Sequence, residues 1–247
     1  MSAEPGWPPG TGRLILEETD STNAEAARRA GSLALPVWIM ARRQTAARGR
    51  RGRPWAMPEG NFAATLVLRE ADPGRAALRS FVAALALAEA LDATAPGAAV
   101  ALKWPNDVLL NGGKVAGILL ESVARGQAVA VGIGVNLAAA PAPGTLEPGA
   151  LRPVSVAGET GHATDPEHFL ALLAAAFARW EGRFAAFGFA PVRAAWLARA
   201  ARLGERIVAR TGEGALAGRF EDIAEDGALV LATPEGRRAI HAAEVFF

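Results

Sequence analysis

The segment from Arg42 to Arg53 holds six arginines and no acidic residue. Guanidinium groups bind phosphate and carboxylate oxygens through forked hydrogen bonds, and the interleaved Gly49 and Gly52 let a backbone fold closely around a ligand. The pattern favours a loop that closes over a small polyanion, with Trp55 placed to stack on or shield the product. A solvated basic loop and a nucleic-acid-binding arm are the alternatives that this segment alone leaves open.

Lysine is rare in this chain, because 24 of the 26 basic residues are arginine and only Lys103 and Lys114 are lysine. A composition rich in Arg, Ala and Gly indicates pressure toward G·C-rich codons. The retained lysines therefore mark positions where a compact ammonium serves and a planar guanidinium does not. Asn111-Gly112-Gly113 predicts a hairpin turn between them. Such a hairpin brings both lysines near Asn106-Asp107. The alternative, which the sequence leaves undecided, is a hairpin whose charged side chains face solvent.

Several other kinds of site are excluded or unsupported. Gly113-Lys114 is no phosphate-binding P-loop, since Val115 follows it and no glycine stands five residues before Gly113. The segment 132–136 lacks the third glycine of a dinucleotide fingerprint, so its glycines let a strand pack closely on a ligand or neighbour. The three histidines are scattered and there is no cysteine. The sequence predicts no protein-ligated metal site, no disulfide and no cysteine nucleophile.

The elements that must position these residues follow from hydrophobic periodicity. A Thr22-to-Glu25 capping box is expected to open a helix that ends near Gly31. Asp165-Pro166-Glu167 opens a later helix whose apolar residues run from Phe169 to Phe187. Further helices are expected over 75–92 and 190–201. Strands are expected over 37–41, 61–68, 99–103, 108–110, 115–122 and 128–137, and a proline-rich loop over 141–153. Short strands over 207–211, 216–223, 228–232 and 237–240 predict a small β-barrel.

Length and charge narrow the class of protein. A chain of 247 residues forms one large domain or one domain with a small satellite. It shows no signal-peptide pattern and no membrane-spanning run, so a cytoplasmic protein without a membrane partner is expected. The formal net charge of +1 argues against a dedicated nucleic-acid-binding protein.

Four segments together resemble the biotin protein ligases. These are residues 20–23 (Asp-Ser-Thr-Asn), 44–53 with Trp55, 103–118, and 132–136. Their order and spacing extend over about 120 residues, and the small C-terminal β-domain also fits. The resemblance implies an α+β fold, with a mixed β-sheet flanked by helices over residues 1–202 and an SH3-like β-barrel over residues 203–247.

The resemblance implies that ATP and biotin form biotinyl-5′-AMP, and that the biotinyl group then passes to a lysine of a biotin carboxyl carrier protein. It assigns catalysis to Lys114, Arg48 and Arg50. Biotin contacts are expected from Ser21, Thr22, Asn23 and Gln44, together with Arg48, Gly49, Arg50 and Lys114. The nucleotide contacts are Arg53, Trp55, Asn106 and Asn136. Mg²⁺ is expected to bridge the triphosphate, with at most an indirect contact from Asp107.

One departure from the family pattern is Ala47, where the basic loop usually begins with glycine. Because the Ser21-Thr22-Asn23 segment comes so early, no helix-turn-helix domain is expected before it, and the chain should be an enzyme without a repressor role. A lipoate or octanoate ligase is the chemically related alternative, and a member that binds biotin without turnover is a further one. A homodimer through strand 129–136 stays open, as does the identity of the acceptor carboxylase.

Overall fold

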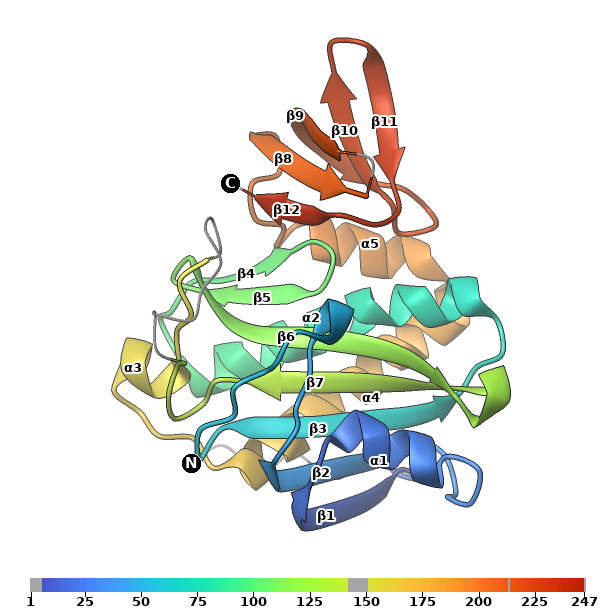
Figure 1. The fold of residues 1–247 in the computed structure, drawn as a ribbon, viewed down its shortest axis with the longest axis vertical. Helices are drawn as coiled ribbons and strands as arrows, with labels where there is room; N and C mark the ends of the chain where they lie inside the picture. Colours follow the sequence, from blue (N-terminus) through green and yellow to red (C-terminus); the bar gives the residue numbers. More distant parts are fainter. Residues whose placement is uncertain (1–5, 142–150, 213, 247) are drawn as a thin grey trace.

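A seven-stranded mixed sheet forms the centre of the larger part of the molecule (Figure 1). The computed structural model describes residues 6–141, 151–212 and 214–246. The strands are β1 (Gly12–Thr19), β2 (Val37–Gln44), β3 (Phe62–Arg69), β4 (Val100–Lys103), β5 (Asp107–Leu110), β6 (Gly113–Val123) and β7 (Ala128–Val135). Their order across the sheet is β1-β2-β3-β7-β6-β5-β4. The pair β1–β2 is parallel, whereas the other neighbours in the sheet are antiparallel.

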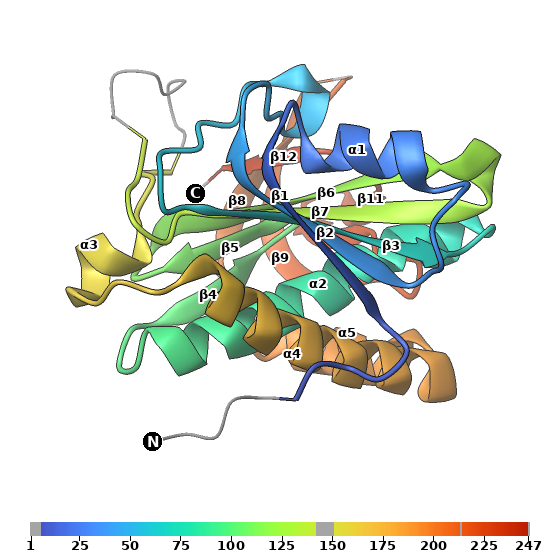
Figure 2. The same cartoon turned by 90° about the horizontal axis from the view of Figure 1, so that it is seen from below.

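Helices cover both faces of this sheet (Figure 2). The short helix α1 (Thr22–Arg29) lies on one face, and the long helices α2 (Pro73–Thr94) and α4 (Pro166–Phe187) lie on the other. The remaining helices are α3 (Val156–Thr160) and α5 (Phe189–Leu197). Because side chains alternate along a strand, β7 contributes residues to the hydrophobic cores on both faces of the sheet. Val131 and Ile133 belong to the main core with α2 and α4, while Ala130 belongs to a smaller core with α1.

The C-terminal part is a five-stranded antiparallel sheet. Its strands are β8 (Arg206–Thr211), β9 (Gly214–Ile223), β10 (Leu229–Thr233), β11 (Gly236–Ile240) and β12 (Glu244–Phe246), in the order β11-β10-β9-β8-β12. It packs on α5 through an edge-to-face pair of Trp196 and Phe220. The indole of Trp104 donates a hydrogen bond of 3.0 Å to the carbonyl of Gly227. These contacts hold β12 close to the strand ends of the larger sheet (Figure 1).

The expected fold class is confirmed, and most expected elements are present. The Asn111-Gly112 turn has positive φ at both residues and joins β5 to β6. Asp165 caps α4 by accepting a hydrogen bond from the amide of His168. Most of the expected loop over 141–153 lies outside the described residues. Strands β1 and β12 and the short helix α3 were not expected. Phe187, expected on the apolar face of α4, is 74% exposed at its end.

The predicted capping box is wrong. Ser21 occupies the N-cap of α1, and no side chain caps this helix. The hydroxyl of Thr22 contacts Thr65 instead, and Glu25 binds Arg28 and Arg29, so the capping box does not form. The sequence left open a homodimer through strand 129–136. The structure excludes pairing of β7 across a two-fold axis, because β3 and β6 occupy its two edges along its length.

Candidate active site

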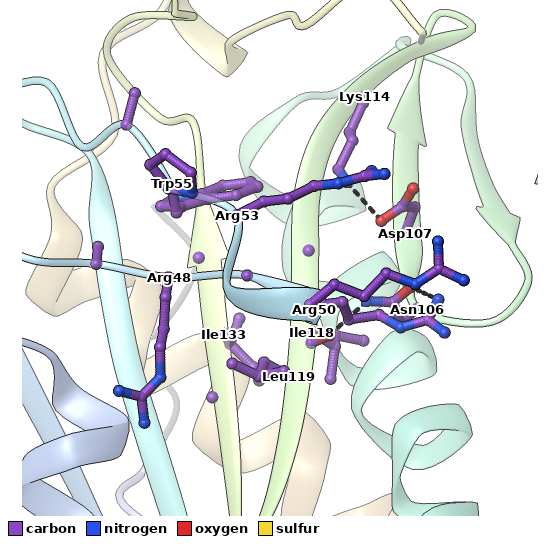
Figure 3. A pocket seen from close by; sticks show the side chains of 18 of the residues that line it. Arg48, Arg50, Arg53, Trp55, Asn106, Asp107, Lys114, Ile118, Leu119 and Ile133 are labelled. Carbon is purple, nitrogen blue, oxygen red and sulfur yellow. Dashed lines mark hydrogen bonds and ion pairs between the residues drawn. The ribbon is translucent and has the colours of Figure 1, made fainter. Parts of the chain in front are cut away.

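One cavity of about 580 Å³ lies between α1, the arginine-rich loop, the strands β6 and β7, and the C-terminal strand β12. All twelve candidate residues line it: Ser21, Thr22, Asn23, Gln44, Arg48, Gly49, Arg50, Arg53, Trp55, Asn106, Lys114 and Asn136. They come from segments as far apart as residues 21 and 136, and the fold brings them to one place. Figure 3 shows how the loop side chains and the strand side chains approach one another there.

The first turn of α1 provides a neutral, hydrogen-bonding wall. Ser21, Thr22 and Asn23 are all buried. The amide of Thr22 donates a 2.7 Å hydrogen bond to Oε1 of Gln44 at the end of β2. The hydroxyl of Thr65 on β3 lies 2.8 Å from Oγ1 of Thr22 and 2.7 Å from Oδ1 of Asn23. This wall therefore offers fixed donors and acceptors without net charge, which suits a neutral polar ligand group.

Glycines form the floor of the cavity. A Cβ at Gly132 would lie 2.1 Å from Oδ1 of Asn23, and a Cβ at Gly134 would lie 2.8 Å from Nε1 of Trp55. A Cβ at Gly117 on the neighbouring strand β6 would lie 3.3 Å from the Trp55 ring. The interpretation that these glycines allow a close approach is confirmed, and the neighbours that they admit are Asn23 and Trp55.

The arginine-rich loop is a small closed structure. The amide of Gly49 donates to the carbonyl of Arg53 (2.8 Å), and the amide of Trp55 donates to the carbonyl of Ala47 (2.9 Å). Within the loop, Arg51 and Gly52 have positive φ, whereas Ala47 does not. A methyl group at position 47 therefore causes no backbone strain in this conformation.

The arginines of the loop point in different directions (Figure 3). Arg48 binds Glu121 at 3.1 Å, toward α1. Arg50 lies 3.4 Å from Oδ1 of Asn106, and burial lowers the pKa of its guanidinium, although the carboxylate of Asp107 opposes that shift. Arg53 binds both carboxylate oxygens of Glu244 at 2.8 and 3.1 Å. The loop therefore distributes positive charge over both ends of the cavity.

The two lysines share one carboxylate. Lys114 Nζ lies 2.7 Å from Oδ1 of Asp107, and Lys103 Nζ lies 3.6 Å from Oδ2. Lys103 is buried, and this burial lowers the pKa of its amine despite the nearby Asp107. Lys114 also lies 5.7 Å from the centre of the Trp55 ring. The hairpin interpretation is thus confirmed in its geometry, because β4, β5 and β6 bring both lysines to Asp107.

Asn106 and Asn136 are held by the backbone. Nδ2 of Asn106 donates to the carbonyl of Ile118 at 2.6 Å, and Nδ2 of Asn136 donates to the carbonyl of Val154 at 3.0 Å. Oδ1 of Asn136 is buried and has no hydrogen-bond partner in the described part of the chain. A buried acceptor without a partner is costly, so this oxygen is suited to a donor group of a bound ligand.

Lys103, singled out in the sequence by the scarcity of lysine, also lines the cavity. Three residues at or beside the cavity were not expected. Thr65 contacts Asn23, Glu121 contacts Arg48, and Glu244 lines the cavity. All three occupy ordinary strand positions with no local signal. Among the described residues, no group of three or more His, Cys, Asp or Glu side chains could hold a metal ion. Within the same ranges, no helix has the length and apolar character needed to cross a membrane.

Comparisons with known proteins match both parts of the chain. Residues 15–137 match the Biotin/lipoate A/B protein ligase family, and residues 203–247 match the Biotin protein ligase C terminal domain. The Biotin--[acetyl-CoA-carboxylase] ligase of Paracoccus denitrificans is 64% identical over 94% of this chain and 99% of its own length. The Bifunctional ligase/repressor BirA of Bacillus subtilis is 31% identical over 94% of this chain and 71% of its own length. The biotin protein ligase of Aquifex aeolicus in complex with biotin and ATP has a TM-score of 0.82 at 26% identity, covering 95% and 97% of the two chains.

Proposed function

Because the chain belongs to the biotin protein ligase family, we propose that this cavity carries both half-reactions of ATP-dependent protein biotinylation. The protein is a biotin ligase with ATP and biotin as substrates. The observation that supports the cavity as its site is the position of all twelve candidate residues around one space, with neutral amides and hydroxyls on the α1 side and cations on the loop and β6.

In the first half-reaction, a carboxylate oxygen of biotin attacks the α-phosphorus of ATP. A bond forms between that oxygen and phosphorus, the bond to the β-phosphate breaks, and pyrophosphate leaves. Two anions must approach one another, so fixed positive charge and alignment lower the barrier. We assign this task to Lys114 and Arg50, with Arg48 and Gly49 closing the loop over the adenylate. The ureido group of biotin would occupy the neutral wall of Ser21, Thr22, Asn23 and Gln44.

The nucleotide would lie on the side of the cavity near β12. Arg53 and Asn106 supply donors for phosphate and ribose oxygens, Trp55 supplies an aromatic face, and the unpartnered Oδ1 of Asn136 suits an exocyclic amine. Mg²⁺ would arrive bound to the triphosphate oxygens. The carboxylate of Asp107 already pairs with Lys103 and Lys114. It therefore suits a water-mediated contact with Mg²⁺ better than direct ligation.

In the second half-reaction, the amine of an acceptor lysine attacks the acyl carbon of the adenylate. The new bond is an amide, the bond from the acyl carbon to the phosphate oxygen breaks, and AMP leaves while the amine loses a proton. We propose that the acceptor is the biotin carboxyl carrier domain of acetyl-CoA carboxylase, as the name of the Paracoccus relative indicates. We place the reaction in the cytoplasm, where ATP is available.

Nucleic acid is not proposed as a partner. Arg48 pairs with the carboxylate of Glu121, and Arg51 and Arg53 pair with that of Glu244. These three arginines therefore do not form a free basic surface. We also propose that the catalytic unit spans residues 1–202 and the C-terminal unit residues 203–247. The interface of any homodimer would lie outside the edges of β7, which pair with β3 and β6.

The deciding experiment is the exchange of labelled pyrophosphate into ATP, measured with biotin and with lipoate or octanoate side by side. The proposal predicts exchange with biotin alone. Exchange with lipoate or octanoate and none with biotin would favour the lipoate-type alternative. Binding of biotin without any exchange would indicate a member that has lost turnover.

A further inference from the structure

Glu121 on β6 connects two parts of the site without lining the cavity itself. Its Oε2 accepts a 2.7 Å hydrogen bond from Nδ2 of Asn23, which belongs to α1. Its Oε1 and Oε2 lie 3.1 and 3.4 Å from the guanidinium of Arg48, which belongs to the arginine-rich loop. One carboxylate therefore links the neutral wall to the loop, over sequence separations of 98 and 73 residues.

The first contact fixes the orientation of the Asn23 amide. Its Oδ1 accepts from Thr65 at 2.7 Å, and its Nδ2 donates both to Glu121 and to the carbonyl of Leu119. If the amide turned over, its oxygen would face the carboxylate and the Leu119 carbonyl, and all three of these groups are acceptors. Asn23 is only 3% exposed, so water cannot relieve that conflict. Glu121, together with the carbonyl of Leu119, therefore fixes the orientation of this amide.

The second contact is of a different kind. The Arg48 side chain is 44% exposed and that of Glu121 is 31% exposed, and an exposed ion pair shifts an equilibrium by up to about fivefold. A contact of this strength can hold a glycine-flanked loop near the cavity and still release it when substrates enter or products leave. Figure 3 shows Arg48 directed away from the cluster of Arg50, Arg53 and Lys114.

We propose that Glu121 is a positioning residue that ties the arginine-rich loop to the amide of Asn23, and thereby sets both the affinity for biotin and the retention of the adenylate. This inference rests on the proposed function, because it gives Asn23 and Arg48 their roles toward biotin and its adenylate. Glu121 itself does not touch the substrate.

Two substitutions separate the two contacts. In Glu121→Gln the amide oxygen still accepts from Asn23, but the uncharged side chain no longer attracts Arg48. Release of preformed biotinyl-5′-AMP should become about three- to fivefold faster, while the KM for biotin stays within twofold of that of the unchanged protein. In Glu121→Ala both contacts are lost, so release should accelerate to the same extent and the KM for biotin should rise about tenfold.

A double-mutant cycle with Arg48→Ala tests the connection directly. If Glu121 acts on release through Arg48, then Glu121→Gln changes the release rate little in the Arg48→Ala background. Glu18→Gln is the matched control, because Glu18 pairs with Arg43 at 2.6 Å between β1 and β2 and neither residue lines the cavity. This control should leave release and KM unchanged.

The inference is overturned if both Glu121 variants keep the original release rate and KM. It is also overturned if Glu121→Gln accelerates release equally with and without Arg48. Thermal unfolding shows whether each variant is folded. If Glu121→Ala does not fold, the isosteric Glu121→Gln still tests the proposal. Absence of biotin-dependent exchange in the unchanged protein would instead contradict the proposed function.

Discussion

Gly132→Ala adds one methyl group at the place where the floor of the cavity is tightest. The new Cβ would lie 2.1 Å from Oδ1 and 2.8 Å from Cγ of Asn23, distances that no pair of these atoms tolerates. Because β3 and β6 hold β7 on both sides, we expect Asn23 to move and the strand to stay. Asn23 then loses its hydrogen bonds with Thr65, Glu121 and the carbonyl of Leu119.

Two neutral bonds and one bond to a charged group contribute about 2.5–6 kcal/mol together. We expect a net loss of about 2 kcal/mol, since an amide displaced into the cavity recovers part of its bonding to water there. About 2 kcal/mol corresponds to a roughly 30-fold change in an equilibrium constant. The KM for biotin in pyrophosphate exchange should therefore rise about 30-fold, while the KM for ATP stays within a few-fold.

Gly182→Ala is the matched control. Gly182 lies within α4, a Cβ there would meet nothing within 4 Å, and its φ is not positive. The same substitution should stabilise the protein by about 0.5–1 kcal/mol and leave the KM for biotin unchanged. A Gly132→Ala protein with the original KM for biotin and an unchanged unfolding curve would refute the reasoning about this floor.

Three further predictions concern charged groups of the site. Lys114→Ala should reduce biotin-dependent pyrophosphate exchange at least about 100-fold, because it removes a fixed cation near the reacting atoms, with little change in the thermal midpoint; near-full turnover would remove Lys114 from catalysis. Glu244→Gln should lower the KM for ATP about two- to fivefold, because the carboxylate of Glu244 competes with the phosphates of ATP for Arg53 and Arg51. A raised KM for ATP in the same exchange assay would contradict this prediction. Lys103→Met should raise the thermal midpoint at pH 7, since burial lowers the pKa of this amine and the folded state holds its charged form at a cost. The cost is complete at pH values below the pKa of Lys103 in the folded state, and it disappears as the pH rises to the pKa of the unfolded state. The difference in thermal midpoint between Lys103→Met and the unchanged protein should therefore shrink in alkaline solution. A lower midpoint for Lys103→Met at pH 7 would contradict this prediction.

The part of the site that could be predicted consists of residues with a local signal. Arg48, Arg50 and Arg53 stand in a basic cluster, Lys114 follows a hairpin turn, and their neighbours form recognisable segments. Glu121 and Glu244 gave no such signal. Each is an ordinary strand residue whose partners are more than 70 positions away, and pairing at that distance depends on strand register and on how the two sheets pack.

The fold shows the same division. Regular periodicity predicted α2 and α4, and turn chemistry predicted the hairpin between β5 and β6. Strand β1 was missed because it is an edge strand whose alternation is weak, with Glu17 and Glu18 adjacent and exposed. The capping box does not form, although Thr22 and Glu25 have the spacing for it. The hydroxyl of Thr22 is instead stabilised by a buried contact with Thr65, and Glu25 pairs with Arg28 and Arg29.

The placement of the two lysines has a consequence for the protein's own surface. An acyl-adenylate that escapes into solvent modifies exposed amines, and lysine side chains are the usual targets. Here Lys103 is 8% exposed and Lys114 is paired with Asp107 within the cavity. The remaining 24 basic residues are arginines, which do not react in this way at neutral pH. The enzyme is thus poorly susceptible to labelling by its own activated intermediate, and amine-directed reagents will find few side-chain sites on it.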